Sequence, residues 1–227
     1  MSSLFVAIFF GPPGAGKGTQ ARRIAEKFNL VNFDTGRFIE EVVHNPLNQD
    51  DPVVQKERKN FDQGYLCAPE WVVQIVREKI KKIYQNKQGL VFSGSPRTLY
   101  EAEKIMPLLS DLYGQENIFV FKINLSQESA VSRNLHRRIC EKCGYQVIYS
   151  PETKNWKFCP LCGGKLVVRS LDNEKSIKVR WDEYRKRTQP VLDYLAQNNF
   201  QIFEINGEPA PDIVTGEVLK YLKSLTK

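Results

Sequence analysis

The 227-residue sequence has no apolar run that approaches the length of a membrane span, and it has no internal repeat or low-complexity tract. A transmembrane helix needs about 20 consecutive apolar residues. The apolar run at residues 4–10 is too short even for the core of a signal peptide with basic flanks. We therefore expect a cytoplasmic protein that does not associate with membranes.

The composition indicates a globular chain, with 26% charged and 41% apolar residues. Its length fits one domain with small insertions. The formal net charge of +7 suits a polyanionic ligand. Because the basic residues are spread along the chain, they do not indicate a nucleic-acid surface, and we expect no nucleic-acid partner.

The strongest motif follows the first apolar run, in the segment LFVAIFFGPPGAGKGTQ. It fits the phosphate-loop pattern G-x-x-x-x-G-K-[ST], with one extra glycine before the hydroxyl residue. Gly14, Gly16 and Gly18 allow backbone N–H groups to surround a phosphate. Lys17 supplies a charge for the β- and γ-phosphates, and Thr19 supplies a hydroxyl for Mg²⁺. A glycine-rich turn that binds nothing is the weaker alternative, since a strand and a helix flank the motif.

The rest of the chain alternates between expected strands and expected helices, which predicts a parallel α/β sheet. The expected strands are 31–33, 90–92, 118–123 and 201–205. The expected helices are 71–83, one over 102–109 that Pro107 should kink or end, 127–138, 174–197 with a bend at Pro190, and 212–225.

Four of the five cysteines stand as C-x2-C-x15-C-x2-C, namely Cys140, Cys143, Cys159 and Cys162. This is zinc-ribbon spacing, and four thiolate ligands would make the site closed and structural. A redox disulfide pair is the alternative. Cys67, in an apolar context, is expected to be a packed side chain. Arginines bracket the ribbon inside a phosphate-loop fold, which favours a phosphoryl-transfer lid over a nucleic-acid module.

Five segments, GPPGAGKGTQ, SGSPRT, HRRICEKCG, CPLCGGKL and LDNE, resemble the adenylate kinase family in order and spacing, and specifically the bacterial form with a zinc-binding lid. The resemblance implies a P-loop NTPase fold, a five-stranded parallel sheet flanked by helices. It also implies a core at 1–34, 67–136 and 175–227, an NMP-binding flap at 35–66 and a zinc-ribbon lid at 137–174.

The resemblance further implies a monomeric nucleoside monophosphate kinase that catalyses Mg·ATP + AMP ⇌ 2 ADP. Its implied catalytic residues are Lys17, Arg97, Arg137, Arg169 and Arg180. The implied ATP-binding residues are Gly14, Ala15, Gly16, Lys17, Gly18, Thr19, Arg137, Gln146, Val147 and Pro209. The implied AMP-binding residues are Thr35, Gly36, Arg37, Gly64, Tyr65, Leu66, Gly94, Arg97, Glu101, Arg169 and Arg180.

Four departures from the family pattern bear on this expectation. Ser93 stands where the family has a Mg²⁺-supporting aspartate, and Leu171 replaces the first of two lid acids. In the flap, Arg37 stands where the family has an acidic residue, and Glu40 stands where it has an arginine. We expect Arg37 to contact the AMP phosphate. Glu101 replaces a glutamine that reads adenine.

A carboxylate at position 101 favours guanine, because it can accept from two adjacent donors. AMP remains the expected acceptor, with GMP, CMP or UMP as the alternative. A P-loop protein that binds nucleotide or RNA without turnover is the distant alternative.

Overall fold

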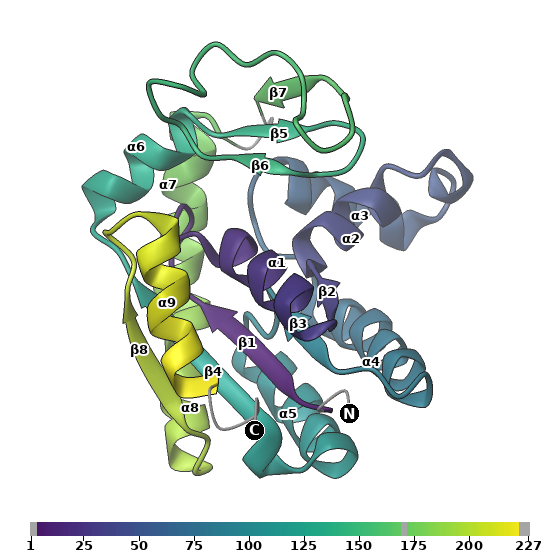
Figure 1. The fold of residues 1–227 in the computed structure, drawn as a ribbon. Coiled ribbons are helices and arrows are strands. Elements are labelled where there is room, and N and C mark those ends of the chain that lie inside the picture. Colours follow the sequence, from purple (N-terminus) through teal and green to yellow (C-terminus); the bar gives the residue numbers. More distant parts are fainter. Residues whose placement is uncertain (1–3, 169–171, 223–227) are drawn as a thin grey trace.

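The computed structural model describes residues 4–168 and 172–222 (Figure 1). Five parallel strands form the central sheet in the order β2-β3-β1-β4-β8. They are β1 (Val6–Phe10), β2 (Val31–Phe33), β3 (Leu90–Phe92), β4 (Ile118–Asn124) and β8 (Ile202–Asn206). This confirms the expected five-stranded parallel sheet. Since β1 lies at the centre and the chain leaves it in both directions, ligands are expected at its carboxyl end.

Alternating side chains of β1 divide the core into two layers. Val6, Ile8 and Phe10 pack with α4 (Pro69–Gln85), α5 (Leu99–Tyr113) and α8 (Gln189–Gln197) on one face. On the other face, Ala7 and Phe9 pack with α1 (Lys17–Phe28) and α9 (Pro211–Leu222). These five β1 residues are at most 3% exposed. A strand buried on both faces explains the unbroken apolar run.

Two excursions leave the core above the carboxyl ends of the strands (Figure 1). The flap carries α2 (Thr35–Val43), the short η1 (Pro46–Asn48) and α3 (Pro52–Asp62). The lid is a small antiparallel sheet of β5 (Arg138–Cys140), β6 (Gln146–Val147) and β7 (Leu166–Val168), in the order β6-β5-β7. Two further elements complete the lid's attachment, α6 (Gln127–Leu135) before it and α7 (Glu174–Glu183) after it.

Helix α5 does not end at Pro107 but continues to Tyr113, preceding η2 (Gln115–Asn117). Pro107 lies on the exposed side of the helix, so the carbonyl groups that its ring displaces can be hydrated. One of the nearby carbonyls, that of Lys104, accepts a hydrogen bond from Arg77 in α4 at 2.5 Å. The apolar residues that follow Pro107 pack on the core, and this packing stabilises the helix beyond the proline.

Two other helix predictions need correction, one at its end and one in its interior. Helix α6 ends at Leu135, three residues earlier than predicted, because Arg138 pairs with Val147 and Val168 as part of the lid sheet. The predicted helix over 174–197 contains a π-helical turn, η3 (Tyr184–Thr188), immediately before α8. The wider turn accommodates Pro190, which cannot donate a backbone hydrogen bond.

Candidate functional site

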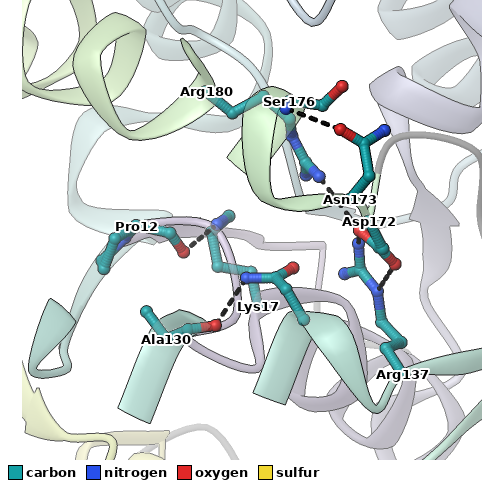
Figure 2. Close-up of polar contacts among 9 residues, drawn as sticks. Pro12, Lys17, Ala130, Arg137, Asp172, Asn173, Ser176 and Arg180 are labelled. Carbon is teal, nitrogen blue, oxygen red and sulfur yellow. Dashed lines mark hydrogen bonds and ion pairs between the residues drawn. The ribbon is translucent and has the colours of Figure 1, made fainter. Parts of the chain in front are cut away.

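The glycine-rich loop between β1 and α1 wraps the ammonium group of Lys17. Its Nζ donates to the carbonyl oxygens of Gly11 and Pro12, each at 2.8 Å. Figure 2 shows the bond to Pro12. Gly16 has a φ of 87°, a left-handed conformation that starts α1 and suits glycine. Gly14 is required for another reason, because an added Cβ would lie 2.7 Å from the carbonyl oxygen of Ala130 in α6.

A cavity of about 560 Å³ runs from this loop to the flap and under the lid. It brings together sixteen of the predicted site residues from six separate stretches of the chain. They are Gly14, Ala15, Gly16, Lys17, Gly18, Thr19, Gly64, Tyr65, Leu66, Gly94, Arg97, Arg137, Gln146, Val147, Arg180 and Pro209.

Positive charge is concentrated around Lys17. Its withdrawal from water lowers its pKa well below the ordinary value, and repulsion by Arg97, Arg180 and Arg137 lowers the pKa further, while Asp34 acts in the opposite direction. Cations placed this close repel one another, so the site is electrostatically complementary to a polyanion. The arrangement suits a ligand with several phosphates.

Asp172 holds two of these arginines. Arg137 donates from Nε to Oδ2 at 2.7 Å and from Nη2 to Oδ1 at 2.5 Å, and Arg180 donates from Nη1 to Oδ1 at 3.2 Å (Figure 2). The Asp172 side chain is fully shielded from solvent. A buried carboxylate between two guanidinium groups fixes both, so it sets their geometry where the lid joins α6 and α7. We did not predict this role from the sequence, although an acid beside an arginine-rich lid was a usable signal. Arg169 and Leu171 lie outside the described residues.

Arg133 is a second residue that the sequence interpretation missed. It lines the cavity and donates to the carbonyl oxygens of Gly207 and Glu208, each at 2.8 Å. Its spacing of four residues from Arg137 at the end of α6 was the available signal. Nearby, the rings of His136 and Tyr149 stack with centroids 4.5 Å apart and also line the cavity. Flat side chains of this kind suit contact with a nucleotide base.

Four predicted AMP-binding residues do not line the cavity. Two lie at its border in the first turn of α2. The Thr35 hydroxyl is buried and has no hydrogen-bond partner among the described residues. Gly36 faces Arg97, because an added Cβ would lie 3.3 Å from its Nη2.

Arg37, the third of these residues, points away from the cavity. Its Nε donates to Glu41 at 2.9 Å, and its Nη1 donates to the carbonyl oxygen of Cys143 in the lid at 2.7 Å. The structure therefore places this guanidinium group between flap and lid. The expected contact with the AMP phosphate stays a prediction that this placement does not favour.

Glu101, the fourth, is 2% exposed and binds its own loop. Its Oε2 accepts from Ser95 Oγ at 3.0 Å and from the Arg97 N–H at 2.9 Å, and its Oε1 accepts from Thr98 Oγ1 at 3.0 Å. Thr98 accepts in return from the Glu101 N–H and so caps α5, in a variant of the capping box in which Glu101 accepts from the Arg97 N–H and not from that of Thr98. Burial raises the pKa of Glu101, and these hydrogen bonds act against the rise. Both oxygens are thus engaged away from any base.

Ser93 directly follows β3 and lines the cavity. Its hydroxyl is buried and forms no hydrogen bond with any described residue. A buried hydroxyl in this state fits a water or a ligand oxygen at the cavity wall. Together with the Thr19 hydroxyl, it offers the oxygen atoms that Mg²⁺ prefers.

The four lid cysteines converge as their spacing predicts. All four Sγ atoms lie within 4.8 Å of one another. The Sγ atoms of Cys140 and Cys162 are 3.5 Å apart, and those of Cys143 and Cys159 are 3.6 Å apart. These separations exceed a disulfide bond and match the roughly 3.8 Å between sulfurs of a tetrahedral zinc site with Zn–S bonds of about 2.3 Å.

The pKa shifts within this cluster run in both directions. The backbone N–H of Cys143 and other donors lower the pKa of Cys140 to about 6, whereas burial raises the pKa of Cys143 to about 12. The fit to a metal therefore rests on the convergence of the four sulfur atoms, and a metal would bind them as thiolates. Four sulfur ligands leave no open position for a reactive water.

Comparison with known proteins agrees with this geometry. A family model described as adenylate kinase matches residues 9–200. The adenylate kinases of Caldicellulosiruptor bescii and Archaeoglobus fulgidus are 36% and 33% identical to this chain over 217 and 220 residues. These alignments cover 95% and 96% of this chain and 97% and 98% of the relatives. Among the described residues, no helix is long and apolar enough to cross a membrane.

Proposed function

We propose that the cavity binds two nucleotides end to end. The premise is that this chain belongs to the adenylate kinase family and transfers phosphoryl groups between ATP and AMP. ATP would lie between the glycine-rich loop and the lid, and AMP between the flap and the Gly94–Arg97 loop. The shape of the cavity supports this assignment, since its walls come from both excursions.

On the ATP side, the loop from Gly14 to Thr19 would hold the phosphates through backbone N–H groups and the charge of Lys17. Gln146, Val147 and Pro209 would contact the base. Arg133 is added to this set, because it fixes the loop at Gly207 and Glu208 beside the base position.

On the AMP side, the backbone at Gly64, Tyr65 and Leu66 would border the nucleotide. Arg97 would hold the AMP phosphate near the path of transfer. Gly94 supports this role, because an added Cβ would lie 2.9 Å from the Arg97 guanidinium group. Thr35 and Gly36 would complete the pocket from the flap.

Transfer itself needs little covalent work from the protein, so positioning and charge carry most of the rate. Lys17, Arg97, Arg137 and Arg180, with Arg169, would neutralise the charge on the transferred phosphoryl group. The lid and flap together would exclude water, which prevents hydrolysis of ATP. Asp172 would keep Arg137 and Arg180 aligned during closure.

Two metals have separate roles in this proposal. The Thr19 hydroxyl would help to hold the Mg²⁺ that accompanies ATP, and that ion would supply positive charge against the phosphates. Zinc in the four-cysteine cluster would stabilise the lid without entering the chemistry. We also propose a cytoplasmic monomer that retains the expected limits of core, flap and lid.

The observation that carries the proposal is the convergence of Lys17 with Arg97, Arg137 and Arg180 around one cavity. A coupled assay for ADP formation tests it with AMP, GMP, CMP and UMP as acceptors. We expect the fastest turnover with AMP. Faster turnover with another monophosphate would change the acceptor, and no turnover with all four would leave a nucleotide-binding protein. Both Glu101 oxygens accept hydrogen bonds from its own loop, which does not favour recognition of GMP by this carboxylate.

A further inference from the structure

Arg37 links two excursions that are far apart in the sequence. It lies in α2 of the flap, and its Nη1 donates to the carbonyl oxygen of Cys143, 106 residues later in the lid, at 2.7 Å. Its Nε donates to Glu41 one helical turn away at 2.9 Å. Glu41 therefore holds one edge of the planar guanidinium group while another edge reaches the lid.

The lid is shaped to receive this side chain. Gly144 follows the acceptor carbonyl with a φ of +71°, and an added Cβ would lie 1.8 Å from Arg37 Nη1. The turn from Cys140 to Gly144 is closed by a hydrogen bond from the Gly144 N–H to the Cys140 carbonyl at 2.9 Å. The position of the acceptor is thus fixed by the same turn that presents two cysteine sulfurs.

The lid also rests on the core beside the glycine-rich loop. The Arg22 guanidinium carbon in α1 lies 4.4 Å from the centroid of the Tyr145 ring. Gln146 approaches Gly18 so closely that an added Cβ would lie 2.9 Å from its Nε2. Gln146, two residues after Gly144, therefore lies beside the glycine-rich loop on the ATP side, while Arg37 reaches the Cys143–Gly144 turn from the flap.

We propose that Arg37 is a positioning residue that joins flap and lid, so that closure over one nucleotide favours closure over the other. The inference rests on the proposed binding of ATP and AMP under separate covers. Coupling of this kind is reciprocal, because each ligand must change the affinity for the other by the same factor. Arg37 thus contributes to cooperativity between the substrates and not to the affinity for either one alone.

Calorimetric titration of the full zinc-loaded chain tests this role. AMP is titrated with and without a saturating non-hydrolysable ATP analogue and Mg²⁺, and the ratio of the two dissociation constants gives the coupling factor. Arg37→Ala should leave the affinity for AMP alone unchanged and should reduce the coupling factor by about fivefold. In the reciprocal titration, the analogue should lose the same factor.

Arg58→Ala is the matched control. Arg58 is an exposed flap arginine that also pairs with an acid four residues later, Asp62, at 3.7 Å. It should retain both the affinity and the coupling. An equal loss of coupling in both variants would overturn the proposal, because it would reflect only the charge of the flap.

Two other results would also overturn the role of Arg37. If Arg37→Ala weakens AMP binding equally with and without the analogue, Arg37 contacts AMP directly. If the variant retains the wild-type coupling factor, the contact with the lid has no energetic effect. Both results are compatible with normal ADP formation by the wild type, whereas failure of the proposed function would abolish that turnover itself.

Discussion

The core and the lid are stabilised by different interactions. The core buries large apolar side chains on both faces of its sheet, including Phe5, Phe9, Phe92 and Phe121, each at most 2% exposed. Among the described residues, the buried cluster of the lid comprises Cys140, Val147, Cys159 and Leu166, with Tyr145 and Cys162 partly buried against it. Phe158, another large lid side chain, is 66% exposed.

From this difference we expect substitutions in the core and in the lid to change different properties. The core has enough buried apolar surface to fold as a unit, so substitutions in its phosphate loop should alter chemistry and leave stability intact. The lid has too small an apolar cluster to be stable alone, and below such a size a metal commonly supplies the missing free energy. Substitutions in the phosphate loop of the core should therefore lower activity, and loss of metal from the lid should lower stability.

The largest expected effect is on turnover, from a change in the core. Lys17→Met removes the central charge of the cluster and should lower kcat by about 10²–10³-fold or more, because transition-state charge is no longer stabilised. The melting temperature should stay close to that of the wild type. Lys27→Met, an exposed lysine at the end of the same helix, is the control and should be fully active. Turnover close to normal in Lys17→Met would contradict the role of the loop.

A cysteine substitution should reverse this pattern by acting on the lid. Cys143→Ser should abolish binding of zinc, whose apparent contribution in small zinc modules is about 10–16 kcal/mol. We expect an early unfolding transition of the lid in calorimetry, an unchanged transition of the core, and some activity at low temperature. Metal analysis should find one zinc in the wild type and none in the variant.

Cys67→Ala is the matched control for the cysteine change. Cys67 is buried in the core, and burial raises its pKa to about 12. The control should keep its zinc and its lid. A metal-free wild-type protein with a fully stable lid would show that zinc has no role.

Asp172 lies where lid and core meet, and its replacement should affect both properties. In Asp172→Asn, the side-chain amide directs its N–H groups at one of the two arginines, which needs an acceptor. The two arginines also lose the negative charge between them and therefore repel each other. We expect kcat/KM to fall by between about 10-fold and 100-fold, as misplacement of positioning groups does. Asp212→Asn is the control, since Asp212 pairs with Arg23 at 2.6 Å but is 86% exposed. An exposed pair is worth less than about 1 kcal/mol, so this control should be nearly silent.

The features that the sequence predicted are those encoded over short distances. β2 and β3 have the predicted bounds, and the cysteines converge, because periodicity and ligand spacing are local properties. The contacts of Arg37 with Cys143 and of Arg137 with Asp172 span 106 and 35 residues. No local pattern specifies them, since they depend on how the excursions meet above the sheet.

Glu101 shows a second limit of sequence interpretation. The spacing after Arg97 placed an acid in the position of a base-reading glutamine. The same residue is also three positions after Thr98, which is the spacing of a capping box. In the structure Glu101 makes this local interaction, and both of its carboxylate oxygens accept hydrogen bonds from the preceding loop.

The smallest expected effect therefore belongs to Glu101→Gln. The amide oxygen can replace Oε2 and accept from Ser95 and Arg97, while the amide nitrogen donates to Thr98, whose hydroxyl can accept twice. We expect the ratio of kcat/KM for AMP to that for GMP to change by less than about twofold. A change of about tenfold or more would show that residue 101 reads the base.

The pH dependence of the melting temperature also tests whether Glu101 is a buried structural residue. Because burial raises the folded-state pKa of Glu101, the folded chain binds more protons than the unfolded chain between the ordinary glutamate pKa, about 4.3, and the raised value. Stability contributed by the protonated carboxyl group is thus lost as the pH rises through this window. Glu101→Gln lacks the ionisation, so its melting temperature relative to the wild type should increase across the window. Glu103→Gln, exposed on the same helix, should show no such trend, and a flat difference for Glu101→Gln would contradict the burial of an ionising carboxylate.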